Sequence, residues 1–344
     1  MTHKLIIWYH ENKRNLPWRN TKDPYSIWVS EIILQQTQIK TGIDYYNRFI
    51  AKFPNIESLS NASELDVLNM WQGLGYYNRA LNMLIAAQTV MKKYHGIFPV
   101  KYDDLIQLKG IGQYTASAIS SICANENKAV VDGNVYRFLS RFYNIATPIN
   151  TSQGKKEFQK LANKMLPSTN TGTYNQAIME FGSIHCRKYM PKCNSCPFQI
   201  ECVSFNSGII NIRPVKNKRT VLKTRYLDYF FIRYNGQFII QQRGSNDIWK
   251  KLYELPLIES TQEISEEQLI NHNYLKRFQI KHIRHISSIK HKLTHQNLKI
   301  NFWETWIKKF PLGNNFLKIT IDEVPKYPFP KPLKKYFDKE HASI

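Results

Sequence analysis

The stretch Leu108-Lys109-Gly110-Ile111-Gly112 lies between two segments, residues 103–108 and 115–122, whose apolar spacing predicts helices. Two glycines let a backbone turn tightly and bring its N–H groups close to a ligand. The second helix would add the positive end of its dipole. The arrangement suits one phosphate group of DNA, which makes Gly110 and Gly112 candidate phosphate-binding residues. A plain turn between two helices would use the same residues, so other features must decide.

Helical patterns surround this turn over roughly the first 200 residues. Apolar residues at positions 135, 138, 139 and 142 follow the spacing of one helix face. The composition changes near residue 210. From Asn211 to Arg225 there are six basic residues and no acidic ones, with Pro214 near the start, which is typical of a solvated linker. We therefore expect a helical region over residues 1–208 and a basic linker over residues 209–225.

Strand patterns follow the linker. Residues 229–234 and 237–240 flank Asn235-Gly236, whose positive φ angles a two-residue hairpin turn requires. A further strand is expected over residues 299–308. The fold class predicted is a mainly α N-terminal region joined to an α+β domain over residues 226–344.

The composition of the chain narrows the classes of molecule that it could bind. The chain has 344 residues, 42% of them apolar, and a formal net charge of +22, which favours nucleic acid over other partners. No window approaches the roughly 18 apolar residues of a membrane span. We expect a cytoplasmic, monomeric protein that binds DNA and no membrane.

The cysteines form one compact group. Cys186, Cys193, Cys196 and Cys202 have the spacing C-x6-C-x2-C-x5-C. Four thiolates so close in sequence can hold a tetrahedral zinc ion or a [4Fe-4S] cluster. Zinc sites usually contain two cysteine pairs, so the isolated first cysteine favours the cluster.

Two carboxylates are expected to lie in opposite environments. Glu31 lies within the apolar stretch of residues 27–34, where burial would raise its pKa, as a general acid requires. Asp132 precedes the helix that contains residues 135–142 and is placed to cap it, which favours the anion. One protonated and one ionised carboxyl group are what cleavage of a glycosidic bond needs. Each residue could instead be purely structural.

Taken together, these segments resemble the helix-hairpin-helix, iron–sulfur family of DNA glycosylases, and within it the MutY-type adenine DNA glycosylases. The resemblance covers nearly the whole chain and is carried by residues 16–19, 30–38, 71–77, 108–114, 131–135 and 175–177 and by the cysteine group. It implies a six-helix barrel over about residues 21–127 and an iron–sulfur subdomain formed by residues 1–20 and 128–208. Residues 226–344 would form a Nudix-like domain that recognises the lesion.

The resemblance also assigns roles to residues. Glu31 would protonate the adenine ring and activate water, and Asp132 would stabilise the sugar cation, with Tyr114 and Asn134 positioning the reacting groups. The pocket for the extruded base would be lined by Trp18, Arg19 and Gln176. Extrusion costs a few kcal/mol of stacking, which intercalating residues must offset. The matching candidates for that task are Gln36, Thr37, Leu74 and Tyr76.

Two sequence features show how this chain differs from related glycosylases. Bifunctional relatives place a lysine where this chain has Tyr114, so the resemblance implies a monofunctional hydrolase that uses water. The 8-oxoguanine loop of the family reads His-x-Phe-Ser-His, whereas this chain has His291-Lys292-Leu293-Thr294-His295. Thr294 can still offer a hydroxyl group, and His295 matches the last histidine of the family motif. Leu293, however, cannot stack on a base as phenylalanine does. No Nudix-box pattern is present, so this domain is not expected to hydrolyse nucleotides.

The function expected is removal of adenine mispaired with 8-oxoguanine or guanine in double-stranded DNA. Two alternatives stay open. One is a bifunctional endonuclease III-like glycosylase and lyase. The other is a non-enzymatic DNA-binding protein whose four cysteines hold a structural metal.

Overall fold

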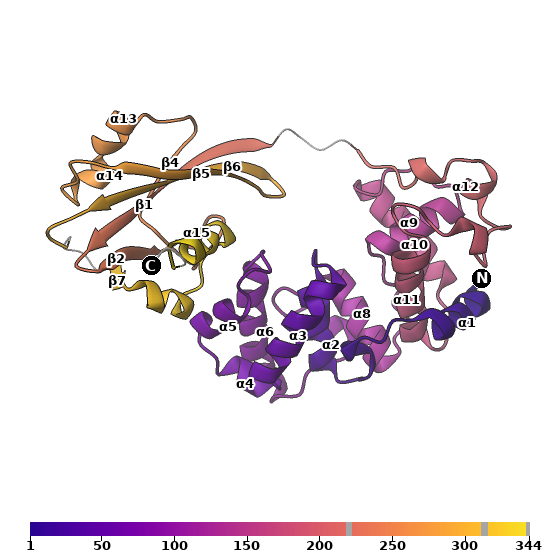
Figure 1. Cartoon of the computed structure of the whole chain (residues 1–344). Helices are drawn as coiled ribbons and strands as arrows, with labels where there is room; N and C mark the ends of the chain where they lie inside the picture. The colour runs from indigo at the N-terminus through magenta and orange to yellow at the C-terminus, as the bar shows by residue number, and fades with distance from the viewer. Residues whose placement is uncertain (218–221, 311–315, 342–344) are drawn as a thin grey trace. The chain divides into compact units, whose positions relative to one another are not determined.

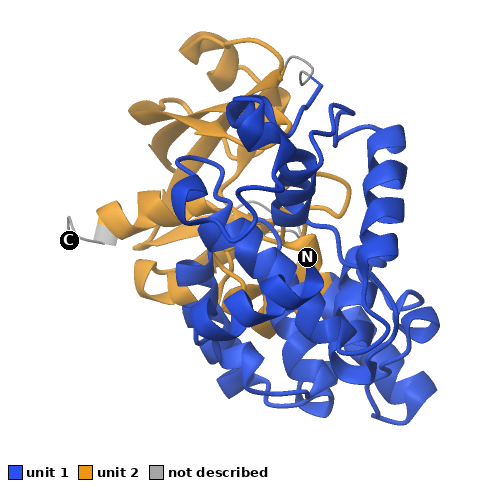
Figure 2. Cartoon of the chain, turned by 90° about the vertical axis from the view of Figure 1, so that its right-hand side faces the viewer, with its two compact units in different colours: residues 1–62, 82–219 blue, residues 63–81, 220–344 orange. Residues whose placement is uncertain are grey.

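The computed structural model describes residues 1–217, 222–310 and 316–341. The chain divides into two compact units, each of which is described by itself (Figure 2). Unit 1 comprises Met1–Ala62 and Asn82–Arg219, and unit 2 comprises Ser63–Leu81 and Thr220–Ile344.

Unit 1 is helical (Figure 1). Short 3-10 turns at Pro17–Arg19, Cys193–Ser195 and Ile210–Ile212 and a π-helical turn at Phe181–His185 join its helices. The helices are α1 (Thr2–Asn12), α2 (Pro24–Leu34), α3 (Ile39–Lys52), α4 (Ile56–Ser60), α6 (Asn78–Tyr94), α7 (Tyr102–Leu105), α8 (Gln113–Ala124), α9 (Gly133–Phe142), α10 (Ser152–Met165), α11 (Thr171–Glu180) and α12 (Val203–Asn206).

The helices predicted around the glycine turn are confirmed. Helix α8 begins directly after Gly112 and ends at Ala124, and the next residue, Asn125, has a left-handed φ of 53° that stops the helix. The helix predicted over residues 103–108 is shorter, since α7 ends at Leu105. Asp132 caps α9 as predicted, because its side chain accepts hydrogen bonds from the N–H groups of Asn134 and Val135.

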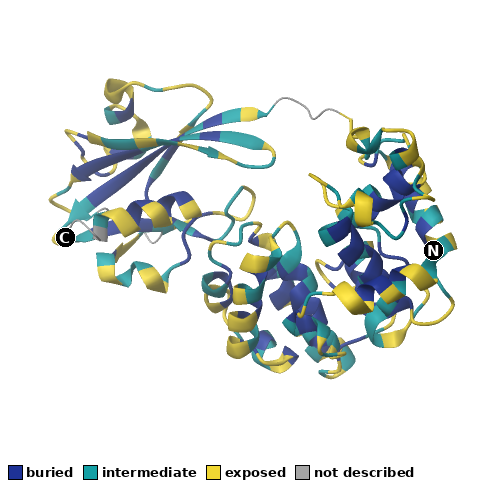
Figure 3. Ribbon diagram, turned by 45° about the vertical axis from the view of Figure 1, so that its right-hand side comes forward, coloured by how far each residue is buried: buried dark blue, intermediate teal, exposed yellow. Residues whose placement is uncertain are grey.

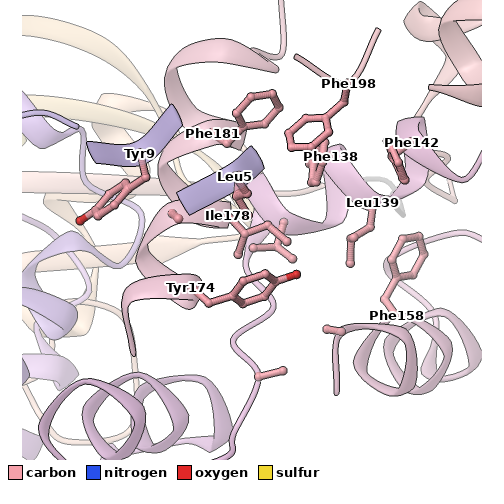
Figure 4. Close-up of a cluster of buried hydrophobic side chains, with 14 of the residues drawn as sticks. Leu5, Tyr9, Phe138, Leu139, Phe142, Phe158, Tyr174, Ile178, Phe181 and Phe198 are labelled. Atoms are coloured by element: carbon pink, nitrogen blue, oxygen red, sulfur yellow. The ribbon is translucent and has the colours of Figure 1, made fainter. Parts of the chain in front are cut away.

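The predicted apolar face of α9 builds one core of unit 1. Val135, Phe138 and Leu139 are almost completely buried, together with side chains of α1, α10 and α11 (Figures 3 and 4). The ring of Phe138 packs 5.0 Å from that of Phe181 and 5.6 Å from that of Phe198, measured between centroids. Each such side chain contributes roughly 1.5–3 kcal/mol. This core holds the N-terminus of α9 and the adjoining cysteine loop in place.

Among the residues that the structure describes, unit 2 contains a seven-stranded mixed sheet with the main strand order β3-β2-β1-β6-β5. Strands β1 and β6 run parallel, β4 pairs with β1, and β7 pairs with β2. Outside the sheet lie α5 (Glu64–Met70), α13 (Glu266–Ile270), α14 (Asn273–Lys276), a 3-10 segment (Ile321–Lys326) and α15 (Lys331–His341). The strands are β1 (Lys223–Tyr234), β2 (Gln237–Gln242), β3 (Tyr253–Glu254), β4 (Leu257–Ser260), β5 (Arg284–Lys292), β6 (Gln296–Trp306) and β7 (Phe316–Ile319).

Both sheet faces are covered, which explains the nearly continuous apolar run in β1. Phe231 packs with Tyr336 and Phe337 of α15 on one face. Phe230 packs with Leu269 and Leu275 of α13 and α14 on the other. The predicted hairpin is confirmed, since Asn235 and Gly236 have φ angles of 47° and 75°.

The structure differs from the predicted domain boundaries at two segments. Residues 63–81, expected within the helical barrel, belong to unit 2. Asn69 Nδ2 donates to the carbonyl of Lys326 at 2.9 Å, and Lys334 Nζ donates to Gln72 Oε1 at 3.2 Å. Strand β1 starts at Lys223, inside the predicted linker. Within the described ranges, no helix is long and apolar enough to cross a membrane.

Candidate active site

A cavity of about 980 Å³ lies in unit 1. Its wall combines α2 and the loop after it, the glycine turn, the N-terminus of α9, and α11. Most of the residues predicted to act in catalysis or DNA binding line this cavity. They are Trp18, Arg19, Glu31, Gln36, Thr37, Gly110, Gly112, Tyr114, Asp132, Asn134 and Gln176.

Glu31 lies on α2, where the cavity wall is otherwise largely apolar. Ile27 and Leu34 line the cavity beside it. Burial raises the pKa of Glu31 to about 7, with a hydrogen bond from Tyr114 opposing the shift and the nearby charge of Asp132 adding to it. A substantial fraction of Glu31 is therefore protonated near neutral pH, as the sequence predicted.

Asp132 is held by three hydrogen bonds. Its Oδ1 accepts from the backbone N–H groups of Asn134 at 2.9 Å and Val135 at 2.8 Å. Its Oδ2 accepts from Asn134 Nδ2 at 2.7 Å. Burial nevertheless raises the pKa of Asp132, and these bonds oppose the rise. The helix cap was predicted correctly, whereas the desolvation of this carboxyl group was not anticipated.

Tyr114, which the resemblance matches to the lysine of bifunctional enzymes, lies in the first turn of α8. Burial raises the pKa of its phenol well above the ordinary value, and the charges of Glu31 and Asp132 raise it further. The phenol therefore stays protonated and donates. Besides its hydrogen bond with Glu31, its hydroxyl contacts the sulfur of Met179 at 3.6 Å.

Arg19 is fixed by an acid that the sequence analysis did not single out. Glu180 at the end of α11 accepts from Arg19 Nη1 at 2.9 Å and Nη2 at 2.8 Å, and Arg14 Nε donates to it at 2.8 Å. Burial alone would raise the pKa of Glu180, but the bonds from Arg14 and Arg19 outweigh it and lower the pKa to about 2. Gln176, one helical turn earlier, accepts from the Tyr9 hydroxyl at 2.8 Å.

The glycine turn has the predicted tight geometry. Gly110 has a φ of 82°, and a Cβ atom added there would lie 2.7 Å from Cβ of Asn82. At Gly112 an added Cβ would meet nothing within 4 Å. Only Gly110 therefore requires glycine for the backbone to fold this way.

A second hollow, of about 520 Å³, shares Tyr114 with the cavity. Lys155, Lys156 and Lys160 of α10 line it together with Gln113. These lysines were missed in the sequence because a lysine-rich helix face is usually only solvated. Their place beside Tyr114 provides positive charge next to the cavity, where a phosphate chain would pass.

The remaining predicted DNA-binding residues belong to unit 2 and are described apart from the cavity: Leu74, Tyr76, Thr294 and His295. Tyr76 has a φ of 50°, is 44% exposed, and shares a hydrogen bond between its hydroxyl and that of Thr294. His295 is exposed at the tip of the β5–β6 hairpin. Leu293 packs partly against the core of the sheet.

The four predicted metal-ligating cysteines line one small hollow: Cys186, Cys193, Cys196 and Cys202. Its other walls include Phe138, Phe142 and Phe198, and Arg141 donates to the sulfur of Cys186 at 3.4 Å. Across the described part of the chain, no three His, Cys, Asp or Glu side chains are close enough to hold a metal ion. The four thiols therefore converge on one space without the tight spacing of a single-ion site.

Comparison with known proteins defines the class of protein to which this chain belongs. Residues 29–166 match the family model of the HhH-GPD superfamily base excision DNA repair proteins, and residues 228–339 match a NUDIX domain model. A solved thermostable thymine-DNA glycosylase aligns with a TM-score of 0.55 and 26% identity, covering 60% of this chain and 95% of that one. An endonuclease III–DNA complex gives 0.53 at 20% identity over 60% and 94% of the two chains, and so shows the fold alone. The fold is that of a helix-hairpin-helix DNA glycosylase with a Nudix-like domain.

Sequence relatives narrow the class further. An adenine DNA glycosylase of Buchnera aphidicola subsp. Baizongia pistaciae is 39% identical over 314 residues, 90% of this chain and 87% of the relative. That of Buchnera aphidicola subsp. Acyrthosiphon pisum is 38% identical over 300 residues, or 86% and 84%. The human adenine DNA glycosylase is 37% identical over 207 residues, or 58% and 38%. The chain belongs to the family of adenine DNA glycosylases, hydrolases that cleave N-glycosidic bonds in base excision repair.

Proposed function

We propose that the chain removes adenine opposite 8-oxoguanine or guanine from double-stranded DNA by water attack and leaves an uncut abasic site. The observation that carries this proposal is the pair of carboxyl groups facing one cavity. Glu31 has a pKa raised to about 7, and Asp132 is held by three hydrogen bonds. Tyr114 stands where a strand-cleaving enzyme needs an amine.

In this mechanism the adenine nucleotide leaves the base stack and enters the cavity, whose volume of about 980 Å³ leaves room for the base and a water molecule. Protonated Glu31 donates its proton to a ring nitrogen, and the bond from that base to C1′ of the sugar breaks. Asp132 stabilises the cationic sugar that remains. Glu31, now ionised, takes a proton from the water that adds to C1′, so that adenine leaves neutral and Glu31 is regenerated.

Other residues of the cavity wall would orient the base. Trp18 is 7% exposed, and Arg19 is held in a planar, bidentate ion pair by Glu180. Gln176 is fixed by the hydroxyl of Tyr9. Because these groups are already bonded to the protein, they are ordered before the base arrives, which lowers the entropy lost on binding.

Mispair recognition is assigned to the hairpin of unit 2. The hydroxyl of Thr294 is bonded to Tyr76 and is the hydrogen-bonding group proposed to face the base opposite adenine. Leu293 packs partly against the sheet and offers no aromatic face. We expect a smaller preference for 8-oxoguanine over guanine than an aromatic residue at position 293 would give.

The cysteine hollow is proposed to hold a [4Fe-4S] cluster. Four thiols line this one hollow, backed by aromatic rings and Arg141, and four cysteine thiolates are the ligand set that such a cluster uses. When bound, the cluster would tie the loop of residues 186–202 to α9. Free thiols of this kind fit a reducing compartment, and we propose a cytoplasmic monomer.

The test is a single-turnover assay with adenine opposite 8-oxoguanine, guanine, cytosine or thymine in otherwise identical duplexes. We expect rapid excision opposite 8-oxoguanine, slower excision opposite guanine, and little opposite the pyrimidines. A variant with Leu293→Phe should widen the ratio between the first two. Equal excision from all four duplexes would refute the proposed mispair specificity while leaving glycosylase activity intact.

A further inference from the structure

A hollow of about 760 Å³ in unit 2 has no part in the proposed glycosylase reaction. Its wall consists of residues 277–284, after α14 and at the start of β5, and residues 304–310, at the end of β6 and beyond. The hairpin tip with Thr294 lies at the other end of these strands. Nine residues of β5, Arg284–Lys292, separate the two ends, or about 30 Å. The hollow is therefore distinct from the hairpin tip.

The wall of this hollow is strongly basic. Among the described residues of this wall, Glu304 is the only carboxylate, and it is already bonded to Arg233 at 2.5 Å and to Arg284. Four other cations are exposed and have no carboxylate partner among the residues that the structure describes. They are Arg277, Lys281, Lys308 and Lys309. Such a cluster of unpaired cations attracts phosphate groups.

A single exposed tryptophan accompanies these cations. Trp306 is 60% exposed at the end of β6, and the guanidinium of Arg284 lies 5.9 Å from its ring centroid. The apolar neighbours Phe278 and Ile283 are 3% and 7% exposed. An open indole face among cations is the combination with which proteins bind unpaired bases by stacking while binding the phosphates electrostatically.

We propose that this hollow, defined by residues 277–284 and 304–310, binds single-stranded DNA. Trp306 stacks on one base, and Lys308, Lys309 and Lys281 contact the flanking phosphates. A duplex would offer phosphates but keep the faces of its bases covered. An acidic peptide would satisfy the cations but offers no base to stack on Trp306. The unpaired strand uses both features of the wall.

The test uses the full chain and a fluorescein-labelled oligothymidylate of about 12 nucleotides, followed by anisotropy at several salt concentrations. Trp306→Ala should weaken this binding about five- to a hundredfold, the effect of losing one stacked base. The same variant should bind an undamaged duplex within about twofold of the wild type. Because Trp306 is exposed, the substitution removes little from the core, which circular dichroism would check.

The contribution of the lysine charges to binding of the single strand is tested separately. Lys308→Gln with Lys309→Gln should reduce the slope of log K against log salt by about 1.4 for the single strand. The matched control, Lys92→Gln with Lys93→Gln, removes another exposed adjacent pair that lines none of the hollows above and should leave the slope unchanged. Adenine excision measured on the same proteins should stay at the wild-type rate.

Three results would overturn the inference. One is wild-type affinity of Trp306→Ala for the oligothymidylate. The second is an equal loss of duplex binding, which would mean that the hollow contacts only phosphates. The third is tighter, Trp306-dependent binding of a polyglutamate peptide, which would identify a protein partner instead. Absence of adenine excision in the wild type would count against the proposed function and leave this binding result unaffected.

Discussion

The raised pKa of Glu31 makes a prediction about stability as well as activity. The carboxyl group has a pKa of about 7 in the folded chain, against an ordinary value of 4.5. The folded state therefore binds the proton more tightly than the unfolded state does. Stability is unaffected by Glu31 below the unfolded pKa and falls as the pH rises through the window between the two values, because the charged form is buried.

A pKa shift of this size lowers the free energy of unfolding by about 3 kcal/mol above neutral pH. Glu31→Gln removes the charge and keeps the shape. It should therefore raise the Tm at about pH 8 by roughly 5–10 °C more than at about pH 5, the range expected for a unit of this size. Differential scanning fluorimetry of both proteins at both pH values measures the difference, in which titrating groups that do not interact with Glu31 cancel.

The same variant should lose adenine excision, since the amide can neither donate the proton nor activate water. General acid–base catalysis is worth about 10²–10⁴-fold. In the wild type the rate should fall tenfold for each pH unit above about 7, because only protonated Glu31 donates. A Tm difference between variant and wild type that is the same at both pH values would refute the buried, raised-pKa carboxyl group. Retained excision would refute its role as the acid.

Three further predictions concern neighbouring residues. Asp132→Asn should abolish excision in the single-turnover assay but change the Tm little, since asparagine also caps α9; a large fall in Tm would show a mainly structural role. Gly110→Ala should destabilise the chain and weaken duplex binding in anisotropy titrations, because its φ is 82° and the added Cβ would lie 2.7 Å from Cβ of Asn82. Gly112→Ala should fold normally, and equal behaviour of the two variants would contradict this account of the turn. Cys193→Ser should remove visible absorption from the purified protein and lower its Tm, and an unchanged spectrum would contradict the proposed cluster.

Local patterns predicted much of the fold and site. The apolar spacing of α9, the cap at Asp132 and the Asn235-Gly236 turn each depend on a few consecutive residues, and all three were confirmed. The raised pKa of Glu31 could also be predicted from the sequence, because an acid within a long apolar stretch of one helix has few polar neighbours wherever that helix packs.

Features that depend on distant residues were not predictable in this way. Glu180 bonds Arg19 across 161 positions, and nothing in its own helix marks it as an ion-pair partner. The desolvation that raises the pKa of Asp132 comes from the walls of the cavity, whereas its cap is local. The packing of Ser63–Leu81 with the sheet unit likewise depends on tertiary contacts such as that of Gln72 with Lys334.

The central claim is that Glu31 and Asp132 excise adenine with water and without a protein amine. It is tested most directly by one single-turnover reaction on a duplex with adenine opposite 8-oxoguanine, divided between mild and hot-alkali workup. We expect free adenine in both halves and a broken strand only after alkali. Strand breakage under mild conditions would contradict the monofunctional mechanism, and intact DNA under both, with binding retained, would contradict the assignment of this cavity as a glycosylase site.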